Sequence, residues 1–452
     1  MSTRRGFLKN SGMMAAGLGL SHLFTEELSA AVPGVKKSYA ASDRVNIGVI
    51  GIRMGWENLN ETLPANPGSQ FVAVCDVNTN RMTSQVARLK KDFPEQTKQV
   101  KEYTDFRKML ENKDIDAVMI CTPDHWHAYM FNEVLKAGKA IYIEKPIAKT
   151  IAECNKMMEL QNRYKQVVTT GLWHANQPYF LQAFEILKTG VLGDVYKVHC
   201  FVTTTTNPRP FVADEPVPDY LDYEMFLGPA PVRPYNSVRY GVWRHFWDYG
   251  GGLQCDWGPH LLDSAFDGIK ALGLINGYTY PKSIVSSAYK HPKSFVETPS
   301  CLSAILEYEN FHVEWTQQVA NLYGTHQGVA WIGSNATLVC NREGIQLIPQ
   351  KDRDGKTTVE PIDTPNPRRY ISGITQHSRN WVECIRNGNI NTSSPLEKGV
   401  FATILSHSSN ISHLTGMKLT YDPITQRFVN NPLADSYLKP VYRKPWDSLW
   451  NE

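Results

Sequence analysis

The sequence predicts an α/β protein in which a doubly wound parallel sheet is followed by a second, strand-rich α+β part. Three observations support this prediction. Short apolar runs alternate with helical stretches between residues 44 and 167, glycine turns or acids follow several of these runs, and β-branched or alternating segments recur later. With 452 residues, the chain is long enough for two sizeable domains.

The first 31 residues have the pattern of an export signal. Arg4 and Arg5 precede Phe-Leu-Lys, an apolar stretch follows over residues 13–24, and small residues occupy 29–31. This resembles the bacterial twin-arginine signal, whereas the alternative is a disordered cytosolic tail. We therefore expect a signal peptide over 1–31, a linker over 32–43, a periplasmic or otherwise exported location in a bacterium, and the twin-arginine export machinery as a partner.

The first strand, turn and helix form a dinucleotide-binding pattern. An apolar run over residues 45–50 ends at Gly51, the turn Gly51-Ile52-Arg53-Met54-Gly55 opens a helix, and a second apolar run ends at Asp76. Glycines let the backbone approach a pyrophosphate, and the helix N-terminus favours its charge. The carboxylate would bind the ribose hydroxyls and repel a 2′-phosphate, which favours NAD over NADP.

The glycine turn departs from the usual fingerprint at two positions. Arg53 stands where the second glycine is expected and Trp56 stands where the third is expected, with Gly55 as a candidate replacement. The surrounding strands still predict a Rossmann domain over residues 44–167.

Two later strands of the predicted sheet end in polar motifs. The run 117–121 leads into residues 122–127 (TPDHWH), and the run 140–143 leads into Glu144-Lys145-Pro146. Ligands bind beyond the carboxyl ends of such strands, so these motifs and the glycine turn should contact the cofactor. We expect no metal at His125 and His127, because no third ligand is nearby. The expected cofactor residues are Gly51, Ile52, Arg53, Met54, Gly55, Asp76, Thr122, Pro123, His125, His127, Glu144 and Lys145.

Taken together, the Rossmann start, the motif at 122–127, Glu144-Lys145-Pro146 and the segment 250–260 (GGGLQCDWGPH) resemble the glucose–fructose oxidoreductase / inositol dehydrogenase (Gfo/Idh/MocA) family. The resemblance implies a C-terminal α+β domain over residues 168–430, with a large, mostly antiparallel open sheet that forms the substrate face and a homo-oligomer contact. The β-branched run at 195–205 and the alternation at 300–315 agree. Residues 431–452 should form an extended tail on the surface.

The resemblance also supplies a catalytic set. Asp256 and His260 are four residues apart, a spacing that puts both on one face of a helix. Imidazole suits the removal of a hydroxyl proton, so His260 is assigned as the base. Asp256 would orient the substrate or hold His260, and Lys145 would donate a hydrogen bond to the oxygen that becomes a carbonyl. Weaker substrate candidates are Trp173, His174, Arg244, Trp247 and Asp248.

These features predict an NAD(P)-dependent oxidoreductase acting on a secondary hydroxyl of a sugar, glycoside or polyol. Its NAD should be tightly bound, because the twin-arginine route carries folded proteins. One alternative is a glycoside hydrolase or lyase that uses transient oxidation, although its N-acetylgalactosaminidase branch lacks the Glu-Lys-Pro tripeptide. Another is a non-catalytic NAD-binding protein, against which the intact Lys-Asp-His set argues.

Charge and cysteine usage exclude other classes. The net charge is +3 over 47 basic and 44 acidic residues, with no basic block, so nucleic acid is not an expected partner. The eight cysteines are scattered without close pairs, which fits neither a disulfide framework nor a zinc site.

Overall fold

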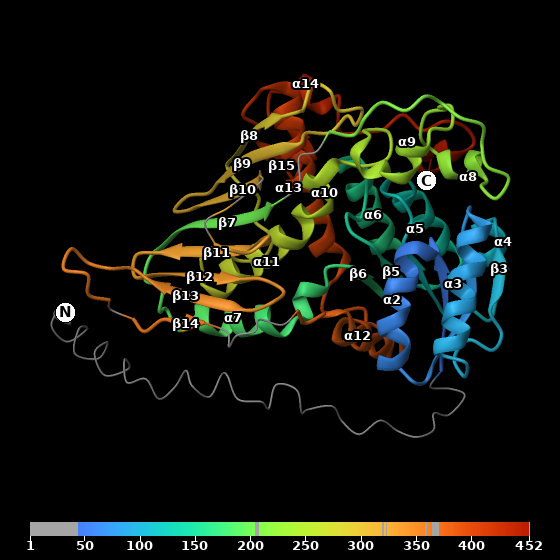
Figure 1. Cartoon of the computed structure of the whole chain (residues 1–452), viewed down its shortest axis with the longest axis horizontal. Coiled ribbons are helices and arrows are strands. Elements are labelled where there is room, and N and C mark those ends of the chain that lie inside the picture. The colour runs from blue at the N-terminus through green and yellow to red at the C-terminus, as the bar shows by residue number, and fades with distance from the viewer. Residues whose placement is uncertain are drawn as a thin grey trace.

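The computed structural model describes residues 44–203, 208–318, 321, 323–357, 359–363 and 370–451. The expected signal peptide and linker, residues 1–31 and 32–43, lie outside the described residues. Two sheets with their helices lie side by side, and the N-terminal one carries the helices α2, α3, α5 and α6 (Figure 1).

The N-terminal domain is a doubly wound parallel sheet, as predicted. Its strand order is β3-β2-β1-β4-β5-β6, and every pairing is parallel. The strands are β1 (Val45–Ile50), β2 (Ser69–Cys75), β3 (Lys101–Tyr103), β4 (Ala117–Ile120), β5 (Ala140–Ile143) and β6 (Val168–Thr170). The helices are α2 (Ile52–Ala65), α3 (Thr79–Asp92), α4 (Phe106–Leu110), α5 (His127–Lys136) and α6 (Ile151–Tyr164).

The central strands are buried on both faces because alternate residues enter different hydrophobic clusters. Val49 and Met119 pack with α2 and α3, whereas Ile50 and Ile120 pack with α5 and α6. This two-sided burial explains why the strands read as continuous apolar runs in the sequence.

The second domain contains an eight-stranded open sheet of order β14-β13-β12-β11-β7-β10-β9-β8. Only the β10–β7 pairing is parallel, which confirms the expected mostly antiparallel sheet. Its strands are β7 (Val195–Thr203), β8 (Ser283–Tyr289), β9 (Cys301–Glu307), β10 (His312–Gln318), β11 (Gln327–Gly333), β12 (Ala336–Cys340), β13 (Ile345–Pro349) and β14 (Ile362–Asp363).

Helices cover one face of this sheet. The apolar core on that face joins the strands to α7 (Pro178–Lys188), α11 (Gly258–Ala271) and part of α13 (Leu396–Thr415). On the opposite face, Val285, Tyr289, Ile305 and Ile348 are exposed.

Helix α13 ties the two domains together. Val400 and Ile404 pack into the core of the N-terminal domain, whereas Phe401 and Leu405 pack into that of the second domain. Near its start, the buried Lys398 pairs with two carboxylates of α11, Asp263 at 3.3 Å and Asp267 at closer range.

Segments beyond residue 167 contribute more to the N-terminal domain than the sequence predicted. Strand β6 pairs with β5, so the parallel sheet extends beyond residue 167. Helix α12 (Ile374–Asn387) packs against α2 and buries Trp381 in the N-terminal core. The domain boundaries drawn at 167 and 430 therefore do not coincide with the packed units.

The prediction of an extended surface tail was wrong. After β15 (Tyr421–Asp422) and β16 (Arg427–Phe428), the chain forms α14 (Pro432–Asp435) and the 3₁₀ turn η7 (Trp446–Asn451). The ring of Trp446 lies 4.8 Å from that of Trp126, centroid to centroid, and is buried. Aromatic packing thus anchors the tail to the N-terminal domain.

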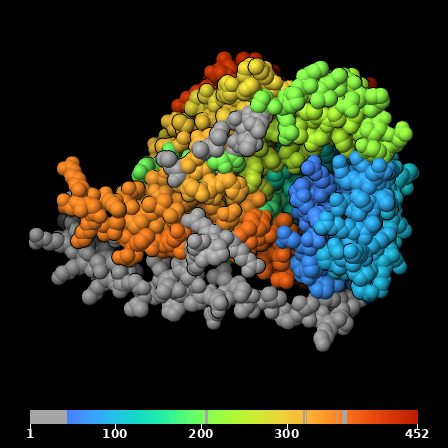
Figure 2. Space-filling view, viewed as in Figure 1, coloured from blue at the N-terminus to red at the C-terminus, as the bar shows by residue number. Residues whose placement is uncertain are grey.

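A segment of the second domain, residues 208–250, lies over the carboxyl ends of the parallel strands, and we name it the roof segment. It contains α8 (Tyr223–Leu227), α9 (Ser237–Gly241) and the 3₁₀ turn η6 (Trp243–His245), and leads into α10 (Gly252–Asp256). Figure 2 shows its green atoms against the blue N-terminal domain. Backbone hydrogen bonds from Thr79 to Tyr220 and from Asp222 to Val77 join the roof segment to the N-terminal domain.

No helix in the described ranges is both long and apolar enough to span a bilayer.

Candidate active site

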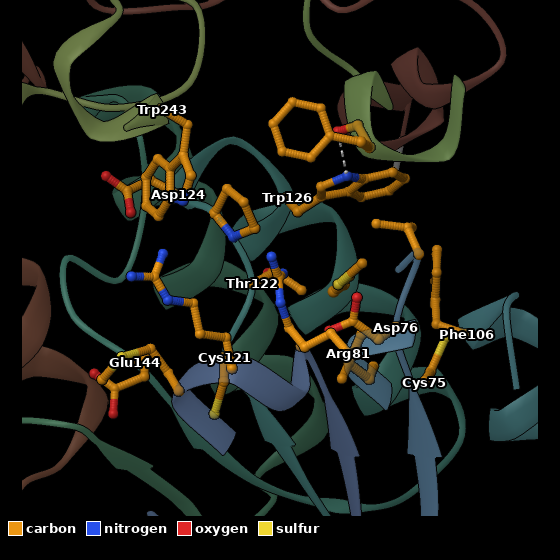
Figure 3. Close-up of a pocket in the computed structure, with 18 of the residues that line it drawn as sticks. Cys75, Asp76, Arg81, Phe106, Cys121, Thr122, Asp124, Trp126, Glu144 and Trp243 are labelled. Carbon is orange, nitrogen blue, oxygen red and sulfur yellow. Dashed lines mark hydrogen bonds between the residues drawn. The ribbon is translucent and has the colours of Figure 1, made fainter. Parts of the chain in front are cut away.

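A cavity lies between the carboxyl ends of the parallel strands and the roof segment. It encloses about 1150 Å³ of space without atoms, part of it open to solvent. Figure 3 shows Asp76, Arg81 and Phe106 at one end, and Asp124, Glu144 and Trp243 at the other. The expected residues that line it are Gly51, Arg53, Met54, Asp76, Thr122, Pro123, Glu144, Lys145 and Arg244.

The altered glycine turn retains two of the roles that the fingerprint requires. Gly51 has a φ of +90°, and a Cβ there would lie 2.5 Å from the carbonyl oxygen of Cys121. A Cβ on Gly55 would lie 2.3 Å from a methyl group of Val49, so Gly55 permits the close packing of helix on strand. Arg53, in the place of the second glycine, lines the cavity instead.

The start of helix α2 fits a pyrophosphate. The backbone N–H groups of Arg53 and Met54 have no hydrogen-bond acceptor among the described residues. They lie in the first turn of a 14-residue helix, where unpaired donors and the helix dipole favour an anion. These unpaired donors, next to Gly51 in the lining of the cavity, therefore suit the phosphates of a dinucleotide.

Asp76 closes the other side of the turn. Its Oδ2 accepts a hydrogen bond from the Ile52 N–H at 2.9 Å, and its Oδ1 accepts one from the Asn78 N–H at 2.8 Å. Burial raises the pKa of the Asp76 carboxyl, although these N–H groups oppose the effect. Each oxygen keeps a second acceptor position for a ribose hydroxyl.

Replacing Asp76 by alanine should reduce the preference for NAD over NADP by about 10- to 100-fold, the scale of a lost hydrogen bond to a charged group. The variant loses the ribose contacts and the repulsion of a 2′-phosphate, while Arg81 remains at that end of the cavity. Calorimetric titration with both cofactors measures the ratio, with Asp92→Ala on the outer side of α3 as a control. Tighter binding of NADP than of NAD by the wild type would contradict this assignment.

At the opposite end, Lys145 forms a charge cluster with Asp256 and Arg244. The Lys145 Nζ donates to Asp256 Oδ1 at 2.6 Å and to the Asp256 backbone oxygen at 2.8 Å. The Arg244 Nε donates to the same Oδ1 at 3.1 Å. Burial alone would raise the pKa of the Asp256 carboxyl, but the two cations hold it well below its ordinary value. Asp256 is therefore ionised, and it fixes the ammonium beside the cavity.

His260 lies beyond this cluster, outside the residues that line the cavity. Its ring stacks on His174 at 5.0 Å and meets the edge of Trp173 at 5.7 Å, centroid to centroid. In the described structure no hydrogen bond joins it to Asp256, which ends α10 while His260 belongs to α11. Asp256 thus does not hold His260 directly, contrary to one of its two expected roles.

Both domains match descriptions of one protein family. Residues 45–172 match the profile described as "Oxidoreductase family, NAD-binding Rossmann fold", and residues 186–269 match the "Oxidoreductase family, C-terminal alpha/beta domain". The chain belongs to the Gfo/Idh/MocA oxidoreductase family. The resemblance inferred from the sequence is confirmed.

Individual relatives show the range of this family. Inositol 2-dehydrogenase of Salmonella paratyphi B (strain ATCC BAA-1250 / SPB7) is 27% identical over 154 residues, which cover 34% of this chain and 44% of that protein. A protein of Shewanella sp. (strain W3-18-1) named glycosyl hydrolase family 109 protein is 30% identical over 204 residues. These residues cover 42% of this chain and 44% of that protein. The chain thus spans less than half the length of these curated relatives.

A solved structure extends the likeness to both domains. Levoglucosan dehydrogenase, in complex with NADH and levoglucosan, aligns with a TM-score of 0.61 and 16% identity over 83% of this chain and 98% of that one. At this identity the likeness establishes a shared fold.

In this Gfo/Idh/MocA protein, four of the expected cofactor residues lie behind the cavity wall and are not part of its lining. Ile52 and Gly55 face the core, and the prediction that His125 and His127 line the cleft was wrong. The His125 Nε2 pairs with the Phe226 carbonyl at 2.9 Å, whereas His127 bonds to the carbonyl groups of Pro146 and Thr122. Within the described ranges, no group of three or more His, Cys, Asp or Glu residues is arranged to hold a metal ion.

Two expected substrate residues also lie elsewhere. Asp248 pairs with Arg233 at 2.8 Å, and Trp247 lines a separate cavity beside Lys149. Trp173 and His174 are next to His260, and Arg244 is next to Asp256, so the structure groups the other three candidates with the proposed catalytic residues.

The structure adds residues that sequence reasoning missed. Arg81, Phe106, Asp124, Tyr240 and Trp243 line the cavity. Asp124 lies within the motif at 122–127, and burial raises the pKa of its carboxyl well above the usual range despite nearby Arg244. The others come from the roof segment or from helices whose local sequence carries no signal for the site.

The pH dependence of this Gfo/Idh/MocA protein should reflect a neutral His260. Burial, together with nearby Lys145 and Arg342, lowers the pKa of the His260 imidazole well below 6.5. The base form therefore persists as the pH falls through 6.5, and kcat/KM should decline only at lower pH. A pH–rate profile with a substrate found by screening tests this, with circular dichroism at each pH as the control for unfolding. An acid limb centred near the ordinary histidine pKa would contradict it.

Proposed function

We propose that this chain oxidises or reduces a secondary hydroxyl of a sugar, glycoside or polyol. The observation that carries the proposal is the Lys145–Asp256 pair at one end of the cavity whose other end presents Gly51 and Asp76. When bound there, NAD supplies the acceptor for a hydride.

The geometry gives Lys145 a defined role. An ammonium has three N–H donors, and Asp256 engages two of them through its carboxylate and its backbone carbonyl. The third remains for the oxygen of a substrate hydroxyl, where it would stabilise the charge that develops as the carbonyl forms. Arg244 secures the ionised state of Asp256, so the ammonium is held in one orientation.

His260 is the group suited to accept the hydroxyl proton. Its ring is neutral, and its Nδ1 is buried without a hydrogen-bond partner among the described residues. The substrate would lie between Lys145 and the aromatic residues around His260. A neutral imidazole there can take up a proton without an additional deprotonation step.

A panel of neutral and acidic sugars and polyols tests the function. Each compound is added to NAD-loaded protein, and reduction of the bound cofactor is followed by its absorbance. We expect at least one member of the panel to reduce the bound cofactor. Binding of NAD without turnover of any sugar or glycoside would favour a non-catalytic NAD-binding protein.

Redox-assisted cleavage of a glycoside is the second candidate, since relatives named glycosyl hydrolase family 109 protein match the chain at 30% identity. In that reaction the hydride returns to the sugar, so reduced cofactor does not accumulate. Chromogenic glycosides separate the two candidates: release of the chromophore without net reduction of NAD supports cleavage. Reduction of NAD without release supports the dehydrogenase.

We further propose export with a retained cofactor, supported by the paired arginines at positions 4 and 5. A protein outside the cytoplasm has no free nicotinamide pool and must recycle its cofactor in place. Protein purified from its native envelope should therefore carry NAD(H), detectable by mass spectrometry after denaturation. Cofactor-free protein, or turnover that strictly requires added NAD and releases NADH stoichiometrically, would contradict this.

We also propose that the open sheet face mediates a homo-oligomer. Val285 and Ile305, opposite each other on β8 and β9, are 41% and 45% exposed. Exposed apolar side chains grouped on one face are typical of an interaction surface. Light scattering of the wild type and of an Ile305→Asp variant tests this proposal: a monomeric wild type would refute it.

A further inference from the structure

Beside the proposed catalytic residues, Arg342 has no acidic partner. It follows β12 and belongs to the turn that leads into β13. Its Nε donates to the His174 Nε2 at 2.9 Å, and its guanidinium lies 4.3 Å from the ring centroid of Trp173 and 4.7 Å from that of Trp257. Among the described residues, no carboxylate forms an ion pair with it.

The carboxylate whose charge acts on Arg342 already pairs with two other cations. Asp256 is the carboxylate that acts on Arg342 from a distance, and its Oδ1 accepts from both Lys145 and Arg244. The Tyr370 phenol forms a hydrogen bond with the guanidinium but carries no charge to balance it. Burial lowers the pKa of Arg342 to about 10, which reflects the cost of this poorly compensated charge. Charges held away from water are normally paired, so this half-buried cation without a carboxylate partner is suited to an anion from elsewhere.

Hydrogen bonds connect Arg342 to the backbone of His260. The hydroxyl of Ser264 donates to the His260 carbonyl at 3.0 Å, so its oxygen is free to accept from the His174 Nδ1 at 3.0 Å. The Nε2 of the neutral His174 then accepts from the Arg342 Nε. This arrangement uses one ring nitrogen as donor and the other as acceptor, and it fixes the guanidinium relative to the proposed base.

We propose that Arg342 binds a carboxylate of the substrate, which makes the substrate an acidic sugar such as a uronic or aldonic acid. The inference rests on the proposed function, whose substrate class it narrows. Two indole rings hold the planar guanidinium, and the terminal N–H groups that Tyr370 leaves free suit the oxygens of a carboxylate. A phosphate dianion would need further cations, but Asp256 pairs with Arg244, and the one free donor of Lys145 is assigned to the substrate hydroxyl.

The structure offers a matched set of variants. Arg342→Gln removes the charge and keeps a polar side chain, whereas Arg342→Lys keeps the charge and loses the planar fork. The control is Arg88→Gln, because the guanidinium of Arg88 also lies over an indole, 4.1 Å from the ring centroid of Trp56, on the outer helix α3. Thermal melts monitored by circular dichroism establish that each variant is folded.

The test compares glucuronate and gluconate with glucose, myo-inositol and glucose 6-phosphate. In the wild type, kcat/KM should be about 10- to 100-fold higher for the acids than for the neutral compounds, the scale of a charge-assisted hydrogen bond. Arg342→Gln should abolish this ratio mainly through KM, Arg342→Lys should restore it in part, and Arg88→Gln should leave it unchanged. Equal use of acidic and neutral sugars by the wild type, a higher kcat/KM for the sugar phosphate, or a ratio unaffected by Arg342→Gln, would overturn the inference.

A binding measurement separates this inference from the proposed function. Calorimetric titration of NAD-loaded protein with glucuronate and glucose requires no turnover. Selective binding of glucuronate that Arg342→Gln removes would support the carboxylate site even if no sugar is oxidised. Turnover of neutral sugars without selective binding of acids would support the proposed function and overturn the carboxylate site.

Discussion

Replacing Lys145 by alanine is expected to lower turnover by about 10²-fold or more, the scale of a lost acid–base or charge-stabilising group. The variant loses the ammonium that Asp256 holds at 2.6 Å beside the cavity. Cofactor affinity should stay within a few-fold, because the glycine turn and Asp76 are unaltered. Steady-state kinetics on an identified substrate, together with NAD titration, measure the two effects separately. His260→Ala should show the same division between turnover and binding.

The controls for Lys145→Ala distinguish chemistry from folding. Lys156→Ala removes another lysine, whose partner Glu159 lies on the surface of α6, and should leave turnover unchanged. Lys145→Arg keeps the charge but changes the donor geometry, and we expect it to remain impaired. Turnover of Lys145→Ala close to that of the wild type would remove Lys145 from the mechanism.

Replacing Lys398 by methionine should lower the free energy of unfolding by about 3–5 kcal/mol, as expected when one partner of a buried ion pair is removed. The change leaves Asp263 and Asp267, one turn apart on α11, without the cation that α13 supplies. Asp263 is the more costly of the two to leave unpaired, since burial raises the pKa of its carboxyl even with Lys398 present. Urea denaturation at neutral pH measures the loss.

A second variant shows whether charge is the cause. Adding Asp263→Asn and Asp267→Asn to Lys398→Met removes all three charges and should recover part of the lost stability. Lys418→Met, which removes a surface pair with Glu307, should have little effect. Stability of Lys398→Met equal to that of the wild type would show that the buried pair is not needed for the junction of the two domains.

The parallel sheet was predictable because its signals are local. Each central strand is an apolar run buried on both faces, and each is followed within a few residues by a turn or a helix. The tail was not predictable in this way. Trp446 packs against Trp126, 320 positions earlier in the chain, and nothing near Trp446 in sequence indicates this contact.

The same distinction between local signals and long-range contacts applies to the candidate site. Lys145 and Asp256 stand in short motifs at the end of a strand and after a glycine run, so their meeting could be anticipated from the resemblance. His125 and His127 lie in the same kind of motif, but the 3₁₀ turn η4 (Asp124–Trp126) and the start of α5 direct both rings toward backbone carbonyls. Arg342 comes from a turn of the large sheet, and only the tertiary fold brings it beside His174.

Direct transfer of hydrogen from sugar to cofactor is the most immediate test of the proposed activity. A substrate from the panel is prepared with deuterium on its carbon atoms and mixed with NAD-loaded protein, and the cofactor is then examined by mass spectrometry. The account predicts that the nicotinamide gains one deuterium from the substrate carbon and that Lys145→Ala slows this transfer by about 10²-fold or more. Product formation with a cofactor that gains no deuterium from the substrate would contradict it.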